Sequence, residues 1–111
     1  MSACHVDVST DRTVFTYVCD NEAQAVLIGY RWGLGYYVEH VYSAAAPRPG
    51  ALKSALRASI AKAASLGAAY VIAFLRNDAD VRLLRLVKAL GFTPYHEDGD
   101  GVYAVRYREA A

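Results

Sequence analysis

The sequence has few of the residues that cross-link small proteins or bind metals. Its 111 residues include two cysteines, Cys4 and Cys19, and three histidines. Both cysteines lie in strand-like segments, so we interpret them as small apolar residues and expect no disulfide. The histidines and cysteines do not show the spacing of a metal site, and no Ser-His-Asp or Cys-His arrangement is legible. We therefore expect neither a bound metal nor a catalytic triad.

An excess of charge of one sign and long apolar runs are also missing. Twelve Lys and Arg residues against eleven Asp and Glu residues give a formal net charge of +1. Such a balance gives no general attraction to nucleic acid or to an anionic membrane, so neither partner is expected. No apolar run approaches the length of a membrane span, and the first residues do not read as a signal peptide. We expect a cytoplasmic protein.

What is present is the composition of one folded domain. Hydrophobic residues make up 55% of the chain, and the mean hydropathy is +0.13, which excludes a disordered protein. The length fits a single domain over residues 1–111 with a small core. The nine tyrosines are an unusual number, and we expect most of them on strands, where amphipathic rings pack well.

The first half of the chain predicts a meander of antiparallel strands. Residues 5–9 alternate in polarity, and residues 13–20 are rich in β-branched and aromatic side chains. Residues 25–32 then read as the hairpin partner of the second strand, and a Gly-Leu-Gly turn leads to a strand over residues 36–43.

Strict alternation along that fourth strand sorts its polar residues onto two faces. Glu39 and Ser43 are expected on one face. His40 and Tyr42 are expected on the other.

The second half predicts helix, buried strand, helix and hairpin. Apolar residues recur at helical spacing from about Gly50 to residue 66, and residues 69–75 form an apolar run typical of a covered strand. A second amphipathic helix follows the Asn77-Asp78 break and ends at Gly91. Residues 92–108 complete the chain as a hairpin.

This order of elements resembles the GNAT N-acetyltransferase superfamily. The match covers roughly residues 13–108, and its most specific part is residues 68–92, where an apolar strand, Asn-Asp and a helix closing in Lys-Ala-Leu-Gly-Phe follow one another. The resemblance implies an α+β fold with a central, mostly antiparallel twisted sheet of about six or seven strands and two main helices. It also implies that two strands splay apart at a wedge that holds acetyl-CoA.

The resemblance further implies which residues would hold that cofactor. The strand end at Tyr42 and Ser43 would bond the pantetheine arm, and Asn77 would contact the pantetheine or the acceptor. Capping of the second helix is the alternative role of Asn77, and the two roles are compatible. The pyrophosphate would lie in the next loop, whose aligned residues are Arg48, Pro49, Gly50, Ala51, Leu52, Lys53 and Ser54. Arg48 matches the family pattern, but Ala51 and Lys53 replace its glycines, so a simple strand-to-helix linker is the alternative.

Aminolysis of a thioester needs a base for the acceptor ammonium and an acid for the thiolate. Glu39 and His40 are adjacent ionisable residues on the strand beside the wedge, and either is a candidate base. The family commonly places an acidic tyrosine on the second helix, where this chain has Val87. Tyr42 or solvent would then supply the proton. The alternative is that all three candidates only pack or pair on the sheet.

The residues before Thr13 are too few for both a first strand and the two helices that usually wall the acceptor site. We therefore expect an open acceptor side, completed by the second copy of a homodimer. Two functions remain open. One is an acetyl-CoA-dependent N-acetyltransferase that modifies an amine acceptor. The other is a catalytically inactive GNAT-fold interaction or structural protein, such as a phage or accessory protein.

Overall fold

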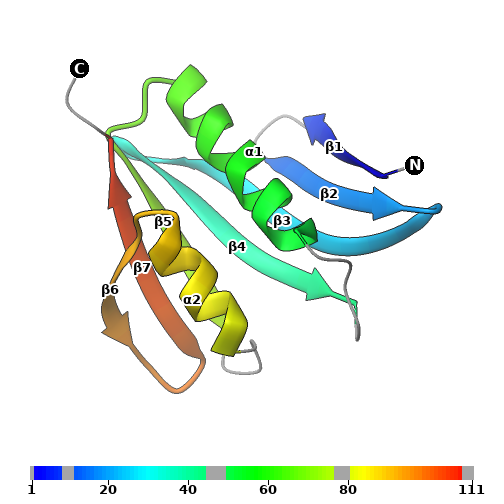
Figure 1. Cartoon of the computed structure of the whole chain (residues 1–111). Helices are drawn as coiled ribbons and strands as arrows, with labels where there is room; N and C mark the ends of the chain where they lie inside the picture. Colours follow the sequence, from blue (N-terminus) through cyan, green and yellow to red (C-terminus); the bar gives the residue numbers. More distant parts are fainter. Residues whose placement is uncertain (1, 9–11, 45–49, 77–80, 109–111) are drawn as a thin grey trace.

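The computed structural model describes residues 2–8, 12–44, 50–76 and 81–108 (Figure 1). Seven strands and two helices occur in this part of the chain. In chain order they are β1 (Ser2–Val8), β2 (Thr13–Cys19), β3 (Glu22–Trp32), β4 (Gly35–Ser43), α1 (Ala51–Ser65), β5 (Tyr70–Arg76), α2 (Val81–Ala89), β6 (Thr93–Glu97) and β7 (Gly101–Tyr107).

The strands form one sheet in the order β1-β2-β3-β4-β5-β7-β6. Every neighbouring pair is antiparallel except β4 and β5, which run parallel because α1 crosses over between them. The predicted α+β sheet is therefore confirmed. β1 begins earlier than the expected residues 5–9, because its backbone pairs with β2 from Ser2 opposite Cys19 to Val8 opposite Thr13.

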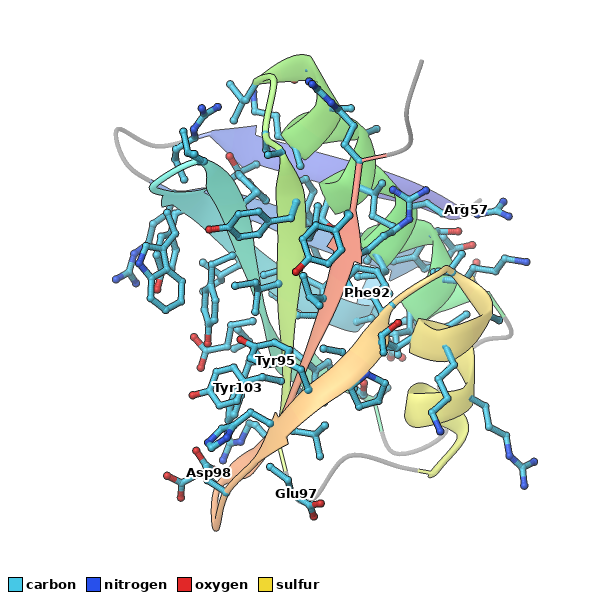
Figure 2. All side chains as sticks on the ribbon, turned by 90° about the vertical axis from the view of Figure 1, so that its left-hand side faces the viewer. Arg57, Phe92, Tyr95, Glu97, Asp98 and Tyr103 are labelled. Carbon is cyan, nitrogen blue, oxygen red and sulfur yellow. The ribbon has the colours of Figure 1, made fainter. Side chains whose placement is uncertain are left out.

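Both helices lie on one face of the sheet (Figure 1). α1 packs across β2 to β4, and α2 lies beside β5 and β7. Leu56 of α1 and Val87 of α2 join the same core cluster as Leu27, Val38 and Ala73, which the strands contribute to that face. We call this side the helix face. In the described ranges no helix covers the opposite side of the sheet (Figure 2).

The sequence explains how α1 is placed. Small and apolar side chains recur along one stripe, so Ala55, Leu56 and Ala63 are buried against the sheet. The helix stops where Gly67 adopts a positive φ of 70°, a conformation that glycine accepts readily. The guanidinium of Arg31 on β3 then donates to the carbonyl of Leu66 and ties the helix end to the sheet.

Neither α1 nor α2 is long and apolar enough to cross a membrane. Among the described residues, no group of three or more His, Cys, Asp and Glu side chains is arranged to hold a metal ion.

Candidate functional site

The parallel pair β4 and β5 separates before either strand ends. Its register runs from Tyr36 opposite Val71 to Glu39 opposite Phe74 and stops there. β4 nevertheless continues to Ser43, and β5 continues to Arg76. Along the described chain, the end of β4 therefore has a strand partner only on its β3 side. This separation is the predicted wedge, and it leaves backbone groups of β4 open to an extended ligand.

A β-bulge changes which side chains of β4 share a face. Leu27 of β3 lies opposite His40, whereas the preceding residue, Val26, lies opposite Tyr42. Val41 is thus the extra residue in β4. The expectation that strict alternation holds to the end of the strand is therefore wrong beyond His40.

The bulge regroups the candidate residues. Ser43 joins His40 on the helix face, and a hydrogen bond of 2.7 Å links His40 Nε2 and Ser43 Oγ. Tyr42 joins Glu39 on the opposite face, because Val26 and Ile28, which they oppose, lie two residues apart on β3. The candidate base Glu39 and the candidate acid Tyr42 therefore share one side of the sheet.

His40 lies in an apolar environment on the helix face. It is 9% exposed and borders a small cavity of about 10 Å³ with Leu52 and Leu56 of α1 and Leu75 of β5. Its hydrogen bond to Ser43 and its packing under α1 favour a structural role. Glu39 is partly buried, and no hydrogen bond or ion pair to its side chain occurs among the residues that the structure describes.

The N-terminus of α1 lies near the end of β4, on the side of the wedge (Figure 1). Gly50 is its N-cap, with a left-handed φ of 80°, and no side chain caps the helix. No acidic residue lies in the first turn. Because the first N–H groups of a helix have no partner within it, this uncapped end carries partial positive charge.

The residues predicted to wrap the pyrophosphate take different positions at this helix end. Ala51 is 1% exposed and packs in the core, and Leu52 packs partly against it. Lys53 is exposed, and Ser54 donates its backbone N–H to the carbonyl of Gly50 at 2.9 Å. Arg48, Pro49 and Asn77 lie outside the described residues, so their predicted roles remain predictions.

Val87 occupies the position at which the resemblance implies an acid. Its side chain is 1% exposed and belongs to the main core cluster. A side chain at this position meets the helix face of the sheet and not the side that carries Glu39. Tyr42 is 47% exposed and lies on the side of the sheet that carries Glu39.

A larger cavity, of about 550 Å³, lies between α1, the end of α2 and β7. Arg57 and Arg106 contribute to its lining, together with Ile60, Ala89, Leu90, Gly91 and Tyr107. It contains none of the predicted site residues. The guanidinium of Arg106 already donates from Nε to the carbonyl of Leu90 at 2.9 Å, which caps the end of α2.

The sequence did not reveal a group of tyrosines beside Glu39. Tyr30 of β3 and Tyr37 of β4 have ring centroids 5.1 Å apart. The ring centroids of Tyr103 of β7 and Tyr95 of β6 are 6.3 Å apart. We call these four residues the tyrosine face. In Figure 2, Tyr95 and Tyr103 lie on the side of the sheet away from both helices, and Phe92 lies on the helix side. Only the strand order brings them together, so the high tyrosine content was the single available signal.

No protein-family model matches the sequence, and no curated protein matches it. Solved structures match its fold. A Bacillus subtilis acetyltransferase in complex with CoA superposes with a TM-score of 0.76 at 14% identity, over 98% of this chain and 100% of that chain. A GNAT family acetyltransferase from Elizabethkingia anophelis with acetyl-CoA bound superposes with a TM-score of 0.68 at 13% identity, over 96% of this chain and 98% of that chain.

Two other similar structures are longer than this chain. The PaiA N-acetyltransferase from Thermoplasma acidophilum, in complex with coenzyme A, superposes with a TM-score of 0.70 at 11% identity and over 88% of this chain. The match spans 62% of that protein and 65% of a putative streptothricin acetyltransferase from Bacillus anthracis. With the sheet order, the β4/β5 wedge and these superpositions in agreement, the chain has the GNAT acetyltransferase fold.

Proposed function

We propose that the protein is an acetyl-CoA-dependent N-acetyltransferase that acetylates an amine acceptor. The observation that carries the proposal is the wedge, where β4 leaves β5 after Glu39 and the N-terminus of α1 returns beside it. Support comes from the solved structures of the same fold, several of which contain CoA or acetyl-CoA. A user of acetyl-CoA would act in the cytoplasm.

The proposed cofactor site uses backbone groups more than side chains. The pantetheine arm would lie along the open edge of β4 from His40 to Ser43, as an added strand does. The pyrophosphate would lie against the N–H groups of Ala51, Leu52 and Lys53, where the uncapped helix end favours an anion. Gly50 leaves open space where a side chain would begin, because nothing lies within 4 Å of its Cβ position. Lys53, Arg48 and Asn77 would add side-chain contacts.

The proposed reaction is a direct transfer. The amine nitrogen attacks the thioester carbonyl, a C–N bond forms and the C–S bond breaks, so acetyl-CoA and R–NH₂ give R–NH–CO–CH₃ and CoA–SH. Glu39 takes the proton that the acceptor ammonium loses, and the phenol of Tyr42 or a water molecule protonates the thiolate. The second proton, which the nitrogen loses when the C–S bond breaks, restores that phenol or water. Glu39 is favoured over His40 as the base because Glu39 and Tyr42 share a face, whereas His40 points under α1.

Calorimetric titration with acetyl-CoA tests this proposal without the acceptor. We expect saturable binding, and at a hundred times the dissociation constant the ligand should stabilise the fold by about 2.7 kcal/mol. Lys53→Ala should weaken binding because it removes an exposed cation from the first turn of α1. Lys88→Ala is a matched control, because Lys88 is an exposed cation in the last turn of α2.

Absence of heat and of any melting shift at millimolar acetyl-CoA would contradict the proposal. It would favour the second candidate, an inactive GNAT-fold interaction protein. Two observations favour that candidate: Ala51 fills a family glycine position with a buried side chain, and Val87 replaces the usual acid.

We also propose that the chain forms a homodimer whose second copy walls the acceptor side of the sheet. Support comes from large side chains that stay in contact with solvent on the described surface, among them Trp32 at 54% and Tyr107 at 70% exposure.

A further inference from the structure

The aromatic rings near Glu39 form two groups of contacts, one on β3 and β4 and one on β5, β6 and β7. Trp32 contacts Tyr37 edge-on at 5.4 Å between ring centroids. On the neighbouring strands, Phe74 lies opposite Glu39 and opposite Tyr103, with 4.7 Å between the rings of Phe74 and Tyr103. Glu39 therefore lies between Tyr37, two residues before it on β4, and Phe74, its partner on β5.

The carboxylate of Glu39 is the charged group that acts on Tyr37. Burial and then the Glu39 carboxylate raise the pKa of Tyr37, and the phenols of Tyr103, Tyr30 and Tyr95 raise it further. Below Tyr95 and Tyr103, Asp98 projects from the β6–β7 turn (Figure 2).

The two arginines near this surface are already engaged. The guanidinium of Arg12 lies over the ring of Tyr30, 5.4 Å from its centroid. Arg76, two residues after Phe74 on β5, also has an interaction partner of its own. Arg12 is an intramolecular example of a cation held by a ring of this face.

We propose that the tyrosine face binds the acceptor as an organic cation, an alkylammonium group held over the ring of Tyr103 beside the carboxylate of Glu39 and the buried ring of Tyr37. Ring faces attract cations through their quadrupole, and a desolvated contact of this kind contributes more than an exposed one. The proposal rests on the proposed function, because it makes this cation the amine whose proton Glu39 accepts. It narrows the acceptor class from amines in general to alkylammonium compounds without an anionic group near the nitrogen.

The single tryptophan gives a direct test, because Trp32 touches Tyr37. Tetramethylammonium chloride is the probe, since it cannot lose a proton, and its effect on tryptophan fluorescence is followed without acetyl-CoA. We expect a saturable change that tert-butanol and sodium chloride at equal concentration do not produce. Glu39→Gln and Tyr103→Leu should each weaken the affinity about threefold to thirtyfold.

Control variants separate the cation site from general packing. Tyr103→Phe keeps the ring and should retain the affinity within about twofold. Tyr107→Leu removes an exposed ring whose contact is with Tyr70, and it should have no effect. Equal responses to tetramethylammonium and tert-butanol would overturn the proposal. So would an unchanged affinity in Glu39→Gln, which preserves the rings and therefore the fold.

The remaining outcomes distinguish this proposal from the proposed function. Binding of acetyl-CoA without binding of the cation overturns the cation site alone. Binding of the cation by a protein that does not bind acetyl-CoA overturns the acceptor role of the site together with the proposed function. Two results together would show that a second copy covers the tyrosine face instead. The fluorescence change would depend on protein concentration, and sedimentation would show a dimer that tetramethylammonium does not affect.

Discussion

At the scale of residues, the account depends on Glu39 and His40, which are neighbours in sequence and face opposite sides of the sheet. His40 is 9% exposed, bonded to Ser43 and packed under Leu52 and Leu56. Glu39 lies among the rings of the tyrosine face. These environments favour a structural role for His40 and the role of base for Glu39, although the intrinsic pKa of histidine suits general base catalysis better.

Substitution of each residue should therefore affect different quantities. Glu39→Gln should lower the turnover of an alkylammonium acceptor about a hundred- to ten-thousandfold, the contribution of a positioned base, with little change in acetyl-CoA affinity. His40→Ala should lower the melting temperature and retain most of the turnover, because it empties an apolar site. Steady-state kinetics with both variants check this. Full turnover in Glu39→Gln and loss of activity in a folded His40→Ala would move the base to the helix face.

At the scale of elements, the N-terminus of α1 carries the cofactor proposal. Gly50 and Gly67 flank the helix with positive φ values of 80° and 70°, and a Cβ at either position would meet nothing within 4 Å. Alanine at either site is strained by its backbone conformation alone, at a cost of about 1–2 kcal/mol. The two positions differ in their distance from the wedge.

Gly50→Ala and Gly67→Ala should consequently lower stability by similar amounts, as measured by urea unfolding. Only Gly50→Ala should also weaken acetyl-CoA binding, because its Cβ would meet the incoming pyrophosphate. Equal affinities in the two variants would place the phosphates away from this helix end.

The order and type of the elements were predictable, because period-two and helical patterns are strong in this chain. The bulge at Val41 was not predictable, since no glycine or other local signal marks it. One extra residue reversed the faces of Tyr42 and Ser43, so the expected grouping of site residues was wrong even though their strand was right. The loop containing Arg48 and the segment containing Asn77 were predicted from the resemblance alone and lie outside the described residues.

At the scale of the whole molecule, both helices cover one face of the sheet and leave the other to aromatic side chains (Figures 1 and 2). The tyrosine face could not be derived from the sequence, because it depends on the parallel register of β4 with β5 and on the position of β7 between β5 and β6. The same arrangement separates the two proposed ligands. The pyrophosphate would approach from the end of α1, and the acceptor from the side without helices.

The central claim is that acetyl-CoA occupies the wedge, and backbone amide chemical shifts measured by NMR during titration with acetyl-CoA test it most directly. We predict that the largest shifts occur at the amides from His40 to Ser43, along the open edge of β4, and from Ala51 to Lys53, at the N-terminus of α1. Amides that line the cavity between Arg57 and Arg106 should change little. The absence of shifts at millimolar acetyl-CoA, or shifts confined to that cavity, would contradict the account.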